Sequence, residues 1–344
     1  MSLLIYGAYG YTGELIAEEA VDRDIDVIVA GRNEVKTEHL AERLDCEARP
    51  FALNAAPANI DDVDVLLNCA GPFTDTYGPF IEACLQTKTH YLDITGELSV
   101  FEAIAERDRE AEQAGICLLP GVGFDVVPTD CLAGHLHDRL PGADGLRLGF
   151  DPSGTISKGT LASVIEHAEE GGKVRRGGDI VDVPPAHRSR RIDFGQGERD
   201  AATIPWGDVS TAYYTTGIEN IEVYTAMPKP MANAARFSRL ASPVLGFEPV
   251  KRSLQALIRA TVTGPSERQR AEGECHIWGE ATDGETTVTS RLKTPETYAL
   301  TVDAATTAAE RVLESPPEGF QTPATAFTPE FVLELDGVEG FFDE

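Results

Sequence analysis

Lysine is scarce in this chain, which has seven lysines among its 344 residues against 22 arginines and 57 acidic residues. The formal net charge is -28 at neutral pH, and the isoelectric point lies near 4.5. A surface this acidic excludes nucleic-acid binding through a basic face. It also predicts self-repulsion in dilute buffer, which molar salt would screen. Few lysines and many carboxylates are typical of a salt-adapted protein; the alternative is an ordinary acidic protein.

Paired cysteine motifs and long apolar runs are also missing. None of the six cysteines forms a Cys-x-x-Cys pair, and most lie within apolar runs such as 67–70. Thiols in that setting are typical of buried residues in a reducing compartment, and they predict neither a disulfide framework nor a zinc site. No apolar run approaches the ~18 residues that a membrane span needs. Because the first predicted strand begins at once, we expect no signal peptide and a cytoplasmic protein.

Short apolar runs alternate with amphipathic stretches in the first third of the chain. We expect buried strands at 3–6, 27–30, 65–69, 91–94 and 116–119. We expect helices between them at 11–21, 34–44, 77–86 and 98–114. Strand–helix alternation at this spacing predicts an α/β fold with a doubly wound parallel sheet of the Rossmann type.

The pattern changes in the second half of the chain. We expect a helix at 126–140, and Asp283-Gly284 between two strand-like runs predicts a hairpin. The stretch 173–191, rich in glycine, proline and arginine, predicts a long loop or an exposed hairpin. We therefore expect a second, α+β domain built on a largely antiparallel sheet. The predicted divisions are an NADP-binding domain over 1–125, a substrate and dimerisation domain over 126–304, and a C-terminal segment over 305–344 that packs back on the first domain.

The first predicted strand ends in a glycine-rich turn that leads straight into a helix. The sequence of the turn is Gly7-Ala8-Tyr9-Gly10-Tyr11-Thr12-Gly13. Gly7 would make the tight turn, Gly10 would let the backbone approach a pyrophosphate, and Gly13 would let the helix pack closely on the strand. N–H groups at the helix N-terminus would bind the phosphates. The turn, with Tyr9, Tyr11 and Thr12, therefore predicts a dinucleotide site; the alternative is a glycine turn without a ligand.

The end of the second strand indicates which nicotinamide cofactor binds. An NAD site places an Asp or Glu there to hold the ribose hydroxyls, whereas this chain has Ala30-Gly31-Arg32-Asn33. A carboxylate that would repel a 2′-phosphate is absent, and the Arg32 guanidinium could clamp one. We therefore expect NADP, with Asn33 beside Arg32 and Lys36 as a second charge. The alternative is that Arg32 faces solvent at the start of a helix.

Small residues follow two further predicted strands, and ligands of open parallel sheets bind beyond the carboxyl ends of the strands. The candidate cofactor-binding residues there are Cys69, Ala70, Gly71, Pro72, Phe73, Thr95 and Gly96. Ala70 and Gly71 would let a cofactor lie against the backbone, and Phe73 would pack on the nicotinamide ring or, alternatively, in the core. A thiol nucleophile at Cys69 is the less favoured interpretation, because its apolar neighbours are typical of an inert packed thiol.

Together, these segments resemble those of a known family. The chain resembles the saccharopine dehydrogenase-like oxidoreductases, and within them the trans-acting enoyl reductases, in five segments that occur in this order: GAYGYTG, AGRN, NCAGPF, YLDITGE and GFDVVPTD. The resemblance continues through 204–213, 220–224 and 319–324, and so covers nearly the whole chain. It implies an NADP-dependent oxidoreductase that reduces a C=C bond in a lipid-like or isoprenoid-like substrate. The lysine-pathway members of the family are expected to share mainly the cofactor domain, so saccharopine chemistry is not carried over.

A reduction needs a hydride from the cofactor and a proton from the protein or water. The candidate catalytic residues are Tyr213, Tyr214, Asp125 and Lys158. The tyrosines could instead pack in a strand, and Asp125 could instead cap the following helix; Lys158 could bind a substrate carboxylate.

His135 and His137 lie on different faces of a predicted helix, so we expect no metal site. Because no proton donor is clear, a non-catalytic NADP-binding redox sensor or membrane-associated accessory protein is the alternative function.

Two stretches carry a net positive charge within this acidic chain, at 173–191 and 229–262. In the second, apolar residues alternate with six lysines and arginines. Such a stretch is typical of a helix that lies on an anionic membrane surface or grips an anionic lipid substrate. The alternative is a pair of helices in a core or an interface. We slightly favour this alternative, in which the arginines meet the protein's own carboxylates. We expect a homodimer, and the membrane interpretation predicts peripheral contact through 229–262.

Overall fold

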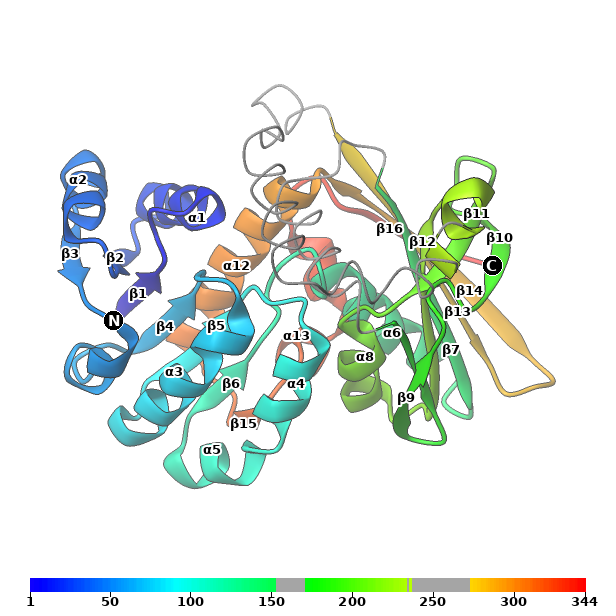
Figure 1. The fold of residues 1–344 in the computed structure, drawn as a ribbon, viewed down its shortest axis with the longest axis horizontal. Helices are drawn as coiled ribbons and strands as arrows, with labels where there is room; N and C mark the ends of the chain where they lie inside the picture. Colours follow the sequence, from blue (N-terminus) through cyan, green and yellow to red (C-terminus); the bar gives the residue numbers. More distant parts are fainter. Residues whose placement is uncertain (153–170, 234, 237–272) are drawn as a thin grey trace. The chain divides into compact units, whose positions relative to one another are not determined.

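The computed structural model describes residues 1–152, 171–233, 235–236 and 273–344 (Figure 1). The chain divides into two compact units. The first comprises Met1–Cys131 and Tyr298–Asp336, and the second comprises Leu132–Thr297 and Gly337–Glu344. Lys158 and most of the basic stretch 229–262 lie outside the described residues.

The first unit is built on a parallel sheet of seven strands in the order β15-β6-β5-β4-β1-β2-β3. The strands are β1 (Ser2–Tyr6), β2 (Asp26–Gly31), β3 (Glu47–Pro50), β4 (Val65–Asn68), β5 (His90–Asp93), β6 (Cys117–Leu119) and β15 (Gly319–Phe320). The order from β3 to β6 is that of a doubly wound dinucleotide-binding fold. The predicted Rossmann sheet is therefore confirmed.

Helices cover both faces of this sheet, which is why its inner strands are continuous apolar runs. Leu3, Leu4 and Ile5 of β1 are fully buried. The helices that connect the strands are α1 (Tyr11–Asp22), α2 (Glu34–Leu44), α3 (Phe73–Thr87), α4 (Leu98–Ala105) and α5 (Asp108–Ala114). Figure 1 shows α3, α4 and α5 on one face and α1 and α2 on the other.

The expected single helix at 98–114 is wrong, because the chain breaks between α4 and α5. The break places Asp108 at the start of α5, where its carboxylate accepts a hydrogen bond from the Phe320 N–H of β15 at 2.7 Å. A strand near the end of the chain therefore fixes the position of this helix.

The chain returns to the first unit near its end. Helix α12 (Thr297–Glu314), helix α13 (Pro323–Phe327) and the 3-10 helix η2 (Pro329–Glu334) accompany β15 there. The Arg23 side chain, at the C-cap of α1, donates hydrogen bonds to Asp303 at 2.6 Å and to Glu310 at 3.1 Å, both on α12. These ion pairs hold α12 beside α1.

The second unit is built on a sheet of nine strands in which β12–β7 is the parallel pair and the other described pairs are antiparallel. The strands are β7 (Gly145–Pro152), β8 (Gly172–Arg176), β9 (Asp179–Val183), β10 (Ser189–Asp193), β11 (Glu198–Ile204), β12 (Asn220–Ala226), β13 (Glu274–Thr282), β14 (Thr287–Pro295) and β16 (Glu339–Asp343). This mixed sheet confirms the predicted second α+β domain. It is accompanied by α8 (Asp208–Thr216) and the end of α6 (Val127–Arg139).

Two predicted turns are present in the second sheet. Strands β13 and β14 form a hairpin in which the Asp283 carboxylate accepts hydrogen bonds from the N–H groups of Glu285 and Thr286. Within 173–191, strands β8 and β9 form a hairpin around Gly177 and Gly178, so the hairpin alternative is the correct one. Among the described residues, no helix is both long and apolar enough to cross a membrane.

Candidate cofactor and active site

The glycine turn between β1 and α1 forms a close-fitting cradle. Gly7 has a φ of +80°, and a Cβ on Gly13 would lie 2.5 Å from the Gly7 carbonyl oxygen. Gly10 is the N-cap of α1 and brings no side chain to cap the N–H groups of the first turn. A pyrophosphate fits this cradle, because the backbone is bare where a phosphate would approach and the positive end of the helix dipole faces it.

The end of β2 leads into α2 with exposed polar side chains. Asn33 is the N-cap of α2, and its Oδ1 accepts a hydrogen bond from the Lys36 N–H at 3.0 Å. The Arg32 guanidinium is exposed and makes no hydrogen bond or ion pair with any residue that the structure describes. Arg32 is therefore available to a ligand at the carboxyl edge of the sheet, whereas the Asn33 side chain also has a structural role in starting α2.

The loop from β4 into α3 crosses the same edge. Gly71 and Pro72 are exposed, and Phe73, the first residue of α3, is half-buried against the core. Glu97 caps this helix from the next loop: its carboxylate accepts hydrogen bonds from Phe73 N–H at 2.8 Å and Thr74 N–H at 2.9 Å. Burial and the Asp93 carboxylate raise the pKa of the Cys69 thiol, so the thiol stays protonated at neutral pH.

A buried polar network lies beneath these loops, and no sequence prediction included it. The Asp93 carboxylate at the end of β5 accepts hydrogen bonds from Thr95 N–H and Gly121 N–H, both at 2.9 Å, and from the Tyr91 hydroxyl at 2.8 Å. Asn68 at the end of β4 donates to the Tyr91 hydroxyl and accepts from Ala70 N–H. The sequence signal was a polar residue closing each of two apolar strands.

Burial raises the pKa of the Asp93 carboxyl to about 6, although three hydrogen bonds to it act in the opposite direction. One buried carboxylate thus joins the loops that follow β5 and β6. These loops carry the predicted cofactor residues Thr95 and Gly96 and the catalytic candidate Asp125.

Asp125 lies directly against Gly96. A Cβ on Gly96 would be 2.7 Å from an Asp125 carboxylate oxygen, so a glycine is required opposite this side chain. The Asp125 side chain is half-buried, and desolvation raises its pKa to about 6. The fold therefore brings together two residues that were predicted separately, at the edge where parallel sheets bind their ligands.

The returning helix α12 adds two residues that sequence reasoning missed. The Tyr298 ring packs edge-on against the ring of Tyr11, the first residue of α1, with centroids 4.9 Å apart. The Thr301 hydroxyl accepts a hydrogen bond from Phe124 N–H at 3.0 Å. Both residues lie within the second domain predicted over 126–304, whereas the structure places Tyr298–Asp336 in the first unit, so no sequence signal pointed to these contacts.

The tyrosine candidates lie in the second unit, on α8, so the expected packing in a strand is wrong. Tyr213 stacks beneath the Arg175 guanidinium, which lies 4.2 Å from its ring centroid, and Tyr214 is 37% exposed. Arg175 itself is buried and donates a hydrogen bond to the Val209 carbonyl.

Lys158, the remaining catalytic candidate, lies outside the described residues. No group of three or more metal-ligating side chains in the described part of the chain is placed to hold a metal ion.

Known families and proteins share parts of this architecture. Residues 3–119 match the family described as the saccharopine dehydrogenase NADP binding domain. This part of the chain is therefore an NADP-binding domain, which confirms the predicted cofactor.

Curated relatives match the chain over part of their length. Human saccharopine dehydrogenase-like oxidoreductase is 26% identical over 212 residues, which are 53% of this chain and 49% of the relative. The trans-acting enoyl reductase of Mycobacterium ulcerans is 29% identical over 148 residues, which are 40% of this chain and 35% of the relative. The chain thus spans at most about half the length of these relatives, and both names given by the sequence resemblance occur among them.

Among solved structures, apo saccharopine dehydrogenase (L-Glu forming) from Saccharomyces cerevisiae is similar to the chain, with a TM-score of 0.63 at 14% identity. The match covers 97% of this chain and 96% of that protein, and at this identity it shows a shared fold alone. The expectation that saccharopine dehydrogenases share mainly the cofactor domain with this chain is therefore wrong as regards the fold.

Proposed function

We propose that the chain is an NADP-dependent oxidoreductase that reduces a C=C bond in a lipid-like or isoprenoid-like substrate. The observation that carries the oxidoreductase part is the match of residues 3–119 to an NADP-binding domain, together with the bare glycine cradle at the end of β1. The enoyl substrate class is supported by the relatives named trans-acting enoyl reductase.

The protein's own residues have three tasks in this proposal. The cradle of Gly7, Gly10 and Gly13 holds the pyrophosphate, and Arg32 holds the 2′-phosphate. The loops at 69–73 and 95–96 enclose the nicotinamide end, with their conformations fixed by Asp93 and by Glu97. Bound NADPH supplies the hydride at this edge.

Asp125 is the residue that we assign to proton delivery. Its half-buried carboxyl, with a pKa raised to about 6, is partly protonated near neutral pH, where a general acid works best. Tyr213, Tyr214 and Lys158 are proposed as substrate-binding residues of the second domain. The protonated Cys69 thiol is given no nucleophilic role.

We also propose that the basic stretch 229–262 contacts an anionic membrane surface. A separate proposal is that the protein is a homodimer. Of its described cations, Lys229 forms an ion pair with Asp200 at 3.4 Å, and Arg236 donates to the Ala186 carbonyl. Vesicle flotation in concentrated salt tests the membrane contact, and light scattering tests the dimer. Absence of vesicle binding would remove the membrane contact and leave the proposed reaction untouched.

The direct test of the reaction is NADPH consumption with a panel of enoyl lipids and isoprenoids in molar KCl. We expect oxidation of NADPH with at least one unsaturated substrate and formation of its saturated product. Asp125→Asn is the inactive comparison and should still bind NADP. If NADP binds and no substrate of the panel consumes NADPH, the proposed reaction fails and the non-catalytic NADP-binding alternative stands.

A further inference from the structure

The segment 121–125, which follows β6 and ends in Asp125, is anchored to neighbouring elements. The Gly121 N–H donates to the Asp93 carboxylate at 2.9 Å, and the next N–H of the segment donates to the Asp93 carbonyl oxygen at 2.8 Å. The Gly123 carbonyl oxygen accepts a hydrogen bond from the N–H of the first residue of α6 at 2.9 Å. The segment is therefore fixed by β5 at its start and by α6 at Gly123.

A helix from near the end of the chain holds the middle of this segment. The Thr301 hydroxyl, on α12, accepts a hydrogen bond from the Phe124 N–H at 3.0 Å. A Cβ on Gly123 would lie 3.0 Å from Thr301 Cγ2 and 3.6 Å from Ile94 Cβ, so Gly123 packs closely against α12 and against the residue after β5. Thr301 thus contacts both residues that precede Asp125.

The hydrogen bond from Phe124 to Thr301 matters because Phe124 is buried. A buried N–H that loses its acceptor is costly, and the chain relieves the cost by moving until the N–H meets water. Loss of the Thr301 hydroxyl would therefore displace the backbone directly before Asp125.

The Asp125 carboxyl has little room to follow such a displacement. A Cβ on Gly96 would lie 2.7 Å from an Asp125 carboxylate oxygen and 3.1 Å from its Cβ. Glu97, the charged residue beside Gly96, directs its carboxylate to the N–H groups at the start of α3. Desolvation is the cause of the raised pKa of Asp125. Movement of the segment at Phe124 would therefore admit water and lower that pKa.

We propose that Thr301 is a positioning residue for Asp125, because it holds the segment 121–125 in the path that places the Asp125 carboxyl against Gly96. Thr301 acts through the Phe124 N–H and not on the substrate itself. A helix residue 177 positions further along the chain thus supports the proposed proton donor. The inference rests on the proposed function, which takes Asp125 as that donor.

The test compares two substitutions at this one position. Thr301→Val keeps the shape of the side chain and removes the acceptor of the Phe124 N–H, whereas Thr301→Ser keeps the acceptor. Thr301→Val should lower kcat by about tenfold or more, because a misplaced general acid loses much of its effect. Its affinity for NADP should not change. Thr301→Ser should retain most of the activity.

Isotope effects separate misplacement of the carboxyl from loss of folded enzyme. In Thr301→Val, slower proton delivery should limit the rate more strongly, so the solvent deuterium isotope effect on kcat should rise. A smaller folded fraction would lower kcat and leave this isotope effect unchanged, which would contradict a positioning role.

A second measurement needs no substrate. Carbon-13 NMR of the full chain labelled at the aspartate carboxyl carbons, with Asp125→Asn to assign the signal, gives the pKa of Asp125 in molar KCl. This pKa should fall from about 6 toward its ordinary value in Thr301→Val and stay near 6 in Thr301→Ser.

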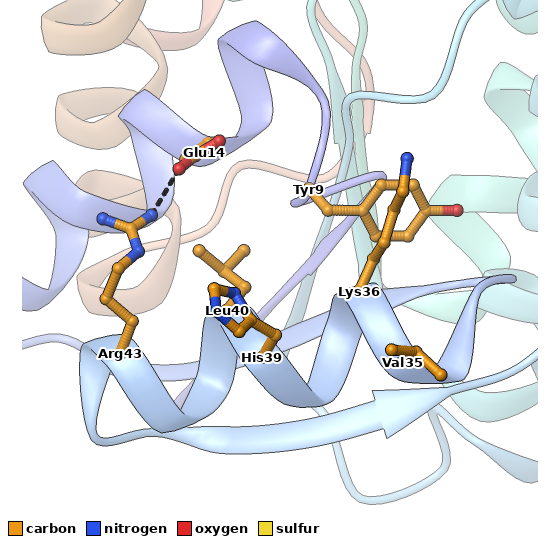
Figure 2. Close-up of a pocket in the computed structure, with 7 residues that line it drawn as sticks. All are labelled: Tyr9, Glu14, Val35, Lys36, His39, Leu40 and Arg43. Atoms are coloured by element: carbon orange, nitrogen blue, oxygen red, sulfur yellow. Dashed lines mark hydrogen bonds and ion pairs between the residues drawn. The ribbon is translucent and has the colours of Figure 1, made fainter.

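Two control variants change other parts of the same unit. Thr306→Val removes a buried hydroxyl of α12 that has no hydrogen-bond partner among the described residues. Arg43→Gln removes the ion pairs that join α2 to Glu14 and Glu18 of α1; Figure 2 shows the pair with Glu14. Both variants should leave the pKa of Asp125 and the solvent isotope effect unchanged.

The outcomes separate this role from the proposed reaction. An unaltered Asp125 pKa in Thr301→Val would overturn the proposal, and so would equal shifts in Thr301→Val and Thr301→Ser, because Ser keeps the acceptor. If the pKa shifts as expected but no substrate consumes NADPH, Thr301 still positions the carboxyl and the proposed reaction fails. If NADPH is consumed with the same kcat in Thr301→Val, the positioning role fails and the proposed function stands.

Discussion

Single carboxylates fix the loops of the candidate site. Asp93 has both oxygens hydrogen-bonded inside the first unit, and it ties the chain after β5 to the chain after β6. Glu97 similarly caps α3 from a different loop. A sequence can indicate that such residues are polar and end a strand. It cannot indicate which distant N–H groups they accept, because those partners are set by the sheet order.

Because of the buried Asp93 carboxyl, the free energy of unfolding should fall as the pH rises. Its folded-state pKa of about 6 exceeds its ordinary value, so the folded state binds more protons than the unfolded state between about pH 4 and 6. The free energy of unfolding should therefore fall by roughly 3 kcal/mol across that window because of this group. Asp93→Asn should lack this contribution in urea titrations at fixed high salt. Parallel pH dependences for the two proteins would contradict the assignment.

The proposed proton donor predicts a pH-rate profile. Because Asp125 must be protonated to act and its pKa is about 6, kcat should fall as the pH rises above 6. Asp125→Asn should lower kcat by about 100-fold or more, with NADP affinity retained. Stopped-flow measurement of NADPH oxidation between pH 5 and 8 tests this. A variant that keeps the wild-type profile would show that the proton comes from another group.

At the scale of helices and strands, the first unit was predictable where the local signals were strong. The strands β1 and β2 and the helices α1 and α2 follow from apolar runs and from the glycine turn. β3 was missed because Glu47–Pro50 alternates charge with little apolar content, and β15 was missed because it has two residues. α8 was missed because its β-branched and aromatic residues favour strands in isolation.

The contact between α12 and the start of α1 predicts that Tyr298, which is distant from the glycine turn in sequence, influences cofactor affinity. Tyr298→Ala removes the ring that packs against Tyr11. It should weaken NADP and NAD by the same factor, because the contact lies at the pyrophosphate end and not at the 2′-phosphate. Calorimetry with both cofactors checks this. A selective loss of NADP alone would be inconsistent with this placement.

The whole molecule carries a charge that its fold must tolerate. The formal net charge is -28 on 344 residues. Below roughly 0.1 M salt the screening length exceeds ~10 Å, so repulsion between the carboxylates is long-ranged. We expect the melting temperature to rise with KCl concentration up to molar values. Sucrose at matched osmolality, which does not screen charge, should raise it less. A flat KCl series would show that the acidity is not an adaptation to salt.

The central claim is that the first unit is built to bind NADP for hydride chemistry. The most direct measurement is the dissociation constant of NADP against that of NAD for the intact protein in molar KCl. The account predicts tighter binding of NADP by about tenfold or more, since Arg32 after β2 and Lys36 in the first turn of α2 supply positive charge near the ribose. Equal affinity for the two cofactors would contradict it.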